Sequence, residues 1–139
     1  MAPGCVLHAV GLEFDVEAFL ATSTFQAHAV YGRNEAAALP GSGDRGKTPS
    51  GFGLSVSDAK PDDLRGQIRD AVLFLDGQED ELRRLGSFPG VEIVALEFRV
   101  RWQDGAPQTE SFPPELLWRA GALDITLQVS HFAIAPRES

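Results

Sequence analysis

The segment 92–102 constrains the fold more than any other part of the chain, because it alternates between apolar and polar side chains. Its apolar positions are Val94, Leu96, Phe98, Val100 and Trp102, and Glu97, Arg99 and Arg101 lie between them. Successive side chains of a strand point to opposite faces, so the pattern predicts a strand with one buried and one polar face. A sheet with a polar face is usually antiparallel and open to water on that side. We therefore expect an α+β fold, with helices on one face of a mostly antiparallel sheet.

An amphipathic helix over 61–85 is the main candidate for the covering layer. Asp62 and Asp63 lie at its start, where acids suit the positive end of the helix dipole. Apolar residues recur at helical spacing, at Leu64, Ile68, Ala71, Val72, Leu75, Leu82 and Leu85. Gly77 weakens the middle of this helix by about 1 kcal/mol relative to Ala, so a kink or break can occur there. The helix is expected to end at Gly86.

Shorter patterns supply the remaining elements. Strands are expected over 5–12, 25–31, 52–57 and 125–134, and short helices over 16–22 and from 112–115 onward. Asp15 is the expected N-cap of the first helix, because its carboxylate can accept hydrogen bonds from free N–H groups of the first turn. Phe14 and Phe19 are placed to form a hydrophobic staple across that turn.

The expected element order is β-α-β-β-α-β-α-β. Its first six elements follow the split βαβ order of ferredoxin-like domains, with a helix and a strand appended. A chain of 139 residues fits a single domain, 1–139, that can bury a core without disulfides or metals. Within it we expect a flexible loop over 33–50, rich in Gly, Ala, Ser and Pro, and a frayed tail over 136–139.

The chain is acidic, with 12 Lys and Arg against 20 Asp and Glu residues and a formal net charge of −8. This charge disfavours nucleic acid and anionic membranes as partners. A basic protein partner stays open, because acidic charge would speed such an encounter, and a homodimer is also possible. Cys5 is the only cysteine, so no intrachain disulfide can form and a reducing compartment is expected. No signal-peptide features are present, and no apolar run approaches the roughly 18 residues of a transmembrane helix. We therefore expect a cytoplasmic protein.

The segment 41–48, Gly-Ser-Gly-Asp-Arg-Gly-Lys-Thr, matches the phosphate-binding pattern G-x-x-x-x-G-K-[ST] in full. The cofactor-binding residues would then be Gly46, Lys47 and Thr48. Lys47 would reach the outer phosphates of a nucleotide, and Thr48 would share Mg²⁺ with Asp76, which ends an apolar run.

The context of this motif favours a solvated loop. A phosphate loop leads directly into a helix whose N-terminus supplies N–H groups. Here Thr48 is followed by Pro49, Ser50, Gly51 and a strand pattern, and Asp76 falls within the amphipathic helix. We therefore expect no cofactor, and a nucleotide-binding enzyme is kept as an alternative.

No other residues form a recognisable catalytic or metal site. His8, His28 and His131 lie on separate predicted strands without metal-ligand spacing, so we expect sheet-surface or hydrogen-bonded histidines. Cys5 and His8 point to opposite faces of one strand and cannot pair as nucleophile and base. Cys5 is therefore expected to be buried. We predict no catalytic residues, no metal and no enzymatic activity.

The polar face of the strand 92–102 is the candidate interaction surface. Glu97, Arg99 and Arg101 project from it near the polar residues of the last strand, and planar arginine side chains suit protein interfaces. We expect a solvated sheet face, and a partner or dimer surface is the alternative.

Four segments resemble a widespread family of small bacterial proteins classified as a domain of unknown function. They are the first strand with the following 12–16 (Leu-Glu-Phe-Asp-Val), the helix 64–85, the strand 91–102, and the helix that begins Phe-Pro-Pro-Glu-Leu-Leu at 112–117 with the final strand. The resemblance covers most of the chain and consists of hydrophobic pattern and element order. Some such proteins lie beside bacterial toxin systems, so the resemblance implies an immunity-like or regulatory binding role and no active site.

These observations favour a non-enzymatic protein-binding module, immunity-like or regulatory, that engages its partner through acidic surface. A nucleotide-binding enzyme that uses 41–48 is the first alternative. A dimeric small-ligand sensor, in which the open sheet forms the dimer, is the second.

Overall fold

The computed structural model describes residues 4–32, 48–102 and 107–133. The strands are β1 (Cys5–Gly11), β2 (Ala29–Tyr31), β3 (Ser50–Ser57), β4 (Ile93–Trp102) and β5 (Thr126–Ala133). The helices are α1 (Val16–Ala21), α2 (Leu64–Gly77), α3 (Glu79–Gly86) and α4 (Pro114–Ala122). The predicted tail 136–139 and residues 33–47 of the predicted loop lie outside the described residues.

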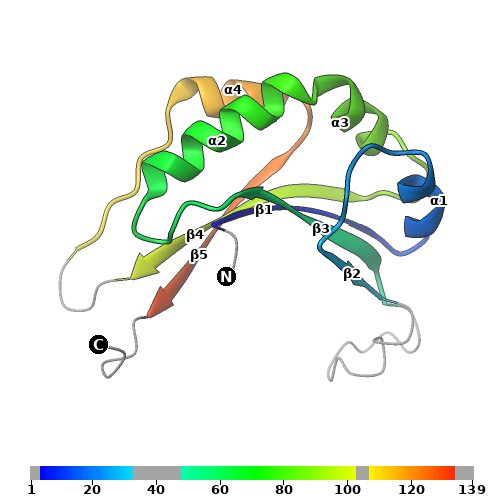
Figure 1. Cartoon of the computed structure of the whole chain (residues 1–139), viewed down its shortest axis with the longest axis horizontal. Coiled ribbons are helices and arrows are strands. Elements are labelled where there is room, and N and C mark those ends of the chain that lie inside the picture. The colour runs from blue at the N-terminus through cyan, green and yellow to red at the C-terminus, as the bar shows by residue number, and fades with distance from the viewer. Residues whose placement is uncertain (1–3, 33–47, 103–106, 134–139) are drawn as a thin grey trace.

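The strands form one open sheet in the order β2-β3-β1-β4-β5. β1 is antiparallel to both of its neighbours, β3 and β4, and β2 is antiparallel to β3. β5 extends the sheet beyond β4 and is parallel to it. Figure 1 shows α2, α3 and α4 along one side of this sheet, with α1 at one end. The opposite face carries no helix in the described part of the chain.

The prediction of an α+β fold with a mostly antiparallel sheet is confirmed. The complete sheet does not match a ferredoxin-like sheet, because it has five strands and a parallel β4–β5 edge. This parallel edge follows from the connection through α4, since a helical crossover returns the chain to the end of the sheet from which β4 started.

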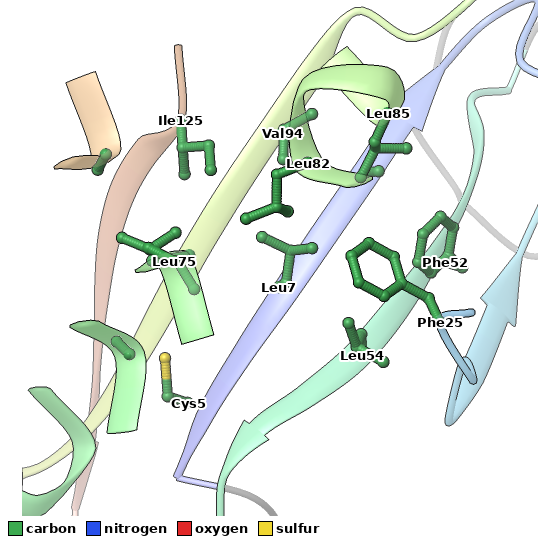
Figure 2. Close-up of a cluster of buried hydrophobic side chains, with 14 of the residues drawn as sticks. Cys5, Leu7, Phe25, Phe52, Leu54, Leu75, Leu82, Leu85, Val94 and Ile125 are labelled. Atoms are coloured by element: carbon green, nitrogen blue, oxygen red, sulfur yellow. The ribbon is translucent and has the colours of Figure 1, made fainter. Parts of the chain in front are cut away.

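One hydrophobic core lies between the sheet and the helices. Leu75, Leu82 and Leu85 of α2 and α3 reach into it toward Leu7 of β1, as Figure 2 shows. At the α1 end, Phe19 stacks on Phe52 with 5.9 Å between ring centroids and meets Phe88 edge-on at 5.2 Å. Aromatic pairs in these arrangements add about 0.5–1.5 kcal/mol to the free energy of burial. The buried strand residues in this core are Cys5, Leu7, Ala9, Phe52, Leu54, Val94, Leu96 and Phe98.

The start of α1 is built as predicted. Asp15 is the N-cap, and its carboxylate accepts a hydrogen bond from the Ala18 N–H at 3.1 Å. Phe14 and Phe19 are in contact, with 6.3 Å between ring centroids, so the predicted staple is present. Cap and staple together fix the turn from β1 into α1.

The long amphipathic helix breaks at Gln78, one residue after Gly77. The Gln78 backbone (φ −115°, ψ 25°) leaves the helical range, so this residue is both the C-cap of α2 and the N-cap of α3. Gln78 N–H still donates to the Phe74 carbonyl, and the Gln78 carbonyl accepts from Leu82 N–H, each at 2.9 Å. The break therefore redirects the chain without leaving these backbone groups unpaired.

Two details of the predicted strands are wrong. Of the predicted strand 25–31, only Ala29–Tyr31 forms a strand. Phe25 instead turns into the core, where its ring stacks on Phe74 at 5.9 Å between centroids, because burial of the ring outweighs local strand propensity. Trp102, expected on the buried side of 92–102, is half exposed at the end of β4.

Candidate functional site

A chain of hydrogen-bonded side chains crosses the open face of the sheet. Tyr31 Oη lies 2.8 Å from His8 Nδ1, and His8 Nε2 lies 2.9 Å from Glu97 Oε1. The second carboxylate oxygen of Glu97 accepts a hydrogen bond from Ser130 Oγ at 2.6 Å. We call Tyr31, His8, Glu97 and Ser130 the cross-sheet network. Its members come from β2, β1, β4 and β5, so it ties together strands that are far apart in the sequence.

The acceptor character of Glu97 orients His8 in this network. Ionised Glu97 can only accept, so His8 donates Nε2–H to it, and in a neutral imidazole Nδ1 would then accept from the Tyr31 hydroxyl. Burial acts to raise the pKa of Glu97, but hydrogen bonds from Ser130 and His8 and the charge of Arg99 bring it below its usual value. Burial, followed by the negative charge of Glu97, raises the pKa of Tyr31. At neutral pH the network therefore holds an ionised carboxylate and a neutral phenol.

The network depends on a glycine in the strand that it crosses. A Cβ at Gly53 of β3 would overlap Tyr31 Oη and would come within 3.4 Å of His28 Cε1. The absence of a side chain at Gly53 leaves the space in which Tyr31, from β2, reaches across β3 to His8 in β1.

Of the three residues of the predicted surface, Glu97 and Arg99 are in contact with each other, whereas Arg101 has a different partner. Arg99 Nη2 lies 3.3 Å from Glu97 Oε1, and the two side chains are 24% and 15% exposed. The guanidinium of Arg99 also lies 6.0 Å from the centre of the Phe132 ring. Arg101 instead pairs with Asp62, which precedes α2, at 3.6 Å. Glu97 and Arg99 are therefore not simply solvated, as was expected, because side chains from other strands contact them and cover part of their surface.

The geometry supports a structural role for the network. A phenol acts as a nucleophile after it loses its proton, and the raised pKa of Tyr31 opposes this loss. Cys5, the one thiol of the chain, lies on the opposite face, buried in the core as predicted. Burial raises the pKa of this thiol, so it is held in its unreactive protonated form.

Two residues of the phosphate-loop hypothesis lie within the described ranges. Thr48 comes two residues before β3, so a strand and not a helix follows it. Asp76 lies in α2, where its carboxylate accepts a hydrogen bond from Arg119 of α4 at 2.9 Å. Both placements agree with the sequence argument against a nucleotide site. Gly46 and Lys47 lie outside the described residues.

The helix layer carries an apolar groove between α2 and the segment that leads into α4. We call it the α2–α4 groove, and its volume is about 640 Å³. One wall is formed by α2 and the other by 111–115, with lining residues Arg65, Ile68, Arg69, Val72, Leu73, Ser111, Phe112, Pro113, Pro114 and Glu115. Open apolar grooves on a helix layer are a recurring form of docking site for amphipathic protein segments.

Two large apolar side chains are exposed on the helices that border this groove. Leu73 of α2 lines the groove and is 64% exposed, and Trp118, outside the lining in α4, is 69% exposed. The Trp118 ring lies 5.9 Å from the guanidinium of Arg119, and Arg119 pairs with both Asp76 and Glu115. The Arg119–Asp76 pair links α4 to α2, whereas the Arg119–Glu115 pair lies within α4. Exposed tryptophan is uncommon on a free surface, and tryptophan is among the residues that dominate binding energy in protein interfaces.

The cations of the groove lie on α2. Arg65 and Arg69 are four residues apart, so their side chains lie on the same side of the helix. Arg69 is largely exposed, with its Nε 3.7 Å from Asp70 Oδ1. Glu115, on the other wall, is paired with Arg119. The groove therefore combines an apolar floor with one cationic edge.

His8 and His131 are held in separate places. His131 Nε2 lies 3.2 Å from Glu110 Oε1, whereas His8 belongs to the cross-sheet network. Within residues 4–32, 48–102 and 107–133, no three His, Cys, Asp or Glu side chains are grouped as a metal site would require. Over the same ranges, no helix combines the length and the apolar character needed to cross a membrane.

Sequence reasoning missed the cross-sheet network and the groove. The alternation of β1 places His8 on the face opposite Leu7, but it gives no sign of a partner 89 residues further along the chain. The exposure of Trp118 could be predicted, because helical spacing puts it opposite Leu116 and Ala120, both of which are buried.

Comparison of the chain with protein-family models, curated proteins and solved structures found no match. The resemblance to a small bacterial family therefore stays a prediction.

Proposed function

We propose that the protein is a non-enzymatic binding module that recognises another protein through the α2–α4 groove. The observation that carries this proposal is the exposure of Leu73 in an apolar groove of about 640 Å³, with Trp118 exposed on α4, the helix that supplies part of the other wall. Large apolar side chains gathered on a surface mark interaction sites, because water solvates them poorly and a partner removes them from water. An immunity-like or regulatory role, as the family resemblance implies, is the biological form that we propose.

The lining residues define the chemistry of the partner. Ile68, Val72 and Phe112 suit apolar side chains, while the exposed guanidinium groups of Arg65 and Arg69 suit carboxylates. In place of the acidic contact surface expected from the net charge, we therefore propose a partner segment that is amphipathic, with apolar anchors and an acidic flank. The net charge of −8 would slow the approach of a strongly acidic partner, so the acid is expected to be local to that segment.

The open sheet face is a weaker candidate for the partner surface. Its central ionisable groups already satisfy one another through the His8–Glu97 and Arg99–Glu97 contacts. A partner that bound there would have to compete with these contacts before it gained new ones. A partner that bound in the groove would bury exposed apolar surface without first breaking such contacts.

Site-specific photo-crosslinking tests the proposal. A photoreactive amino acid would replace Leu73 in the cells that make the protein, and the control would replace Val30, a half-exposed apolar residue of β2. We expect a discrete protein adduct from position 73 and none from position 30. The crosslinked peptide, identified by mass spectrometry, should be amphipathic with an acidic flank.

Two further variants make the outcome specific. Trp118→Ala and Arg69→Glu should each reduce the adduct from position 73, and neither should change the melting temperature by more than a few degrees, because both side chains are exposed. Equal crosslinking from positions 73 and 30, or adducts indifferent to both substitutions, would refute binding in the groove.

We also propose that β1, α1, β2, β3, α2 and β4 form a ferredoxin-like unit, to which α4 and β5 are appended. The antiparallel pairing of β1 with both β3 and β4 supports this interpretation. An experimental structure with β1 at an edge of the sheet would contradict it.

A further inference from the structure

We propose that two copies of this chain associate through β5, so that their sheets join edge to edge. The proposal is independent of the groove and concerns the opposite flank of α4. It is carried by two observations: the composition of β5 at the sheet edge, and the position of an exposed leucine above that edge.

Among the residues that the structure describes, β5 is a long edge strand, and its own sequence lacks the features that usually protect one. It has eight residues, it ends the strand order, and its register with β4 runs without a shift from Thr126 to Ala133. It contains no Asp, Glu, Lys, Arg or Pro. At the other edge, β2 has three residues, which is one of the ways in which proteins blunt an edge. Alternate backbone N–H and C=O groups of β5 point away from β4 and can pair with another strand.

The lack of charge suits pairing of β5 with a second copy of itself. An antiparallel pair related by a two-fold axis brings the same residues together in both directions, so like charges would oppose each other. β5 has no Asp, Glu, Lys or Arg to create that repulsion.

Leu117 supplies apolar surface above the same edge. In α4, Leu116 and Ala120 face the core, and Arg119 points toward α2, where it pairs with Asp76. A rotation of 100° per residue places Leu117 about 200° from Arg119, on the flank of α4 away from α2. α4 packs against both α2 and β5, so that flank overlooks the sheet edge. Leu117 is 50% exposed there.

A two-fold axis perpendicular to the sheet would place both helix layers on the same face. Residues 123–125 join α4 directly to the start of β5, so α4 lies over the first half of that strand. Pairing centred near Gln128 would therefore bring the two α4 helices side by side and bury Leu117 of each copy against the other. Strand and helix then contribute to one self-complementary interface.

Sedimentation velocity of the full chain tests this proposal. We expect the wild type to shift from 15.0 kDa toward twice that mass as its concentration rises. Leu117→Glu and Gln128→Lys should each weaken association by about tenfold or more, because each places like charges at the two-fold axis. Leu73→Glu, an exposed leucine replaced on α2, is the matched control and should leave the dimer intact.

A charge exchange makes the test specific for the two-fold arrangement. An equimolar mixture of Leu117→Glu and Leu117→Lys should restore a dimer that neither variant forms alone. A wild type that stays at 15.0 kDa up to about 100 µM would overturn the proposal. So would a dimer that survives Leu117→Glu and Gln128→Lys. Circular dichroism and thermal melting of each variant would separate loss of association from loss of fold.

Discussion

Replacement of Glu97 by Gln is the most informative perturbation of the cross-sheet network. The Glu97 carboxylate accepts hydrogen bonds from His8 and Ser130 and lies 3.3 Å from the Arg99 guanidinium. Gln has nearly the same shape but one acceptor oxygen, and it carries no charge. The variant therefore removes acceptor capacity and charge without opening a cavity.

The loss of stability expected for Glu97→Gln follows from these contacts. A hydrogen bond to a charged group contributes about 1.5–3 kcal/mol to stability, and Gln can keep one of the two bonds in weaker, neutral form. Because the Glu97 and Arg99 side chains retain 15% and 24% exposure, solvent screens their mutual attraction. We therefore expect the free energy of unfolding to fall by about 2 kcal/mol, which corresponds to a melting temperature lower by roughly 5–10 °C.

Urea unfolding followed by circular dichroism measures this loss. Glu79→Gln is the control, because Glu79 pairs with Arg83 on the exposed side of α3 and its loss should cost about 0.5 kcal/mol or less. If Glu97→Gln were as mild as the control, the network would contribute nothing to stability and the reasoning would be wrong.

The pH dependence of stability checks independently whether Glu97 is ionised in the folded protein. The folded pKa of Glu97 lies below its usual value of 4.5, so folding favours its ionised form. This contribution is fully present above the unfolded pKa and is lost as the pH falls through the folded pKa. The stability difference between wild type and Glu97→Gln should therefore shrink as the pH falls below about 4.5. A difference that persists unchanged at pH 3 would contradict the ionised assignment.

Three further predictions concern single residues. Gly53→Ala should lower the free energy of unfolding by about 2 kcal/mol, because the added Cβ would overlap Tyr31 Oη and break the Tyr31–His8 hydrogen bond. Urea unfolding measures this loss, and an unchanged stability would show that Tyr31 Oη does not lie so close to Gly53. The Cys5 thiol should react with a disulfide reagent about a hundredfold more slowly in the native protein than in urea, since it is buried and protonated; equal rates would contradict its burial. Gly77→Ala should raise stability by about 0.5–1 kcal/mol, because nothing lies within 4 Å of the added Cβ, and a loss in thermal melts would show that the break needs glycine.

Patterns that depend on neighbouring residues were predictable from the sequence. The alternation of 92–102 gives the sidedness of the sheet, and the spacing of apolar residues in 64–85 gives the covering helix. Asp15 and Phe14 mark the start of α1 through contacts within one turn. In each case the signal and the structure that it predicts lie within a few residues of each other.

Features that depend on distant residues were not predictable. β5 takes its place beside β4 through tertiary packing, and no local pattern distinguishes that edge of the sheet from the other. Glu97, expected to be solvated, is instead bonded to His8 and Ser130 from other strands. The groove likewise needs the packing of α2 against 111–115. Candidate functional surfaces in this protein therefore arise from the arrangement of elements rather than from any motif.

Hydrogen exchange with and without the partner segment locates the binding surface on the protein. The crosslinked peptide identified from position 73 would be synthesised and added in excess, and exchange would be followed by mass spectrometry. When the peptide is bound, we expect slower exchange over α2 and 111–118 and unchanged exchange over β1 and β4. Protection centred on His8, Tyr31 and Glu97, with α2 and α4 unaffected, would contradict it and move the binding surface to the open face of the sheet.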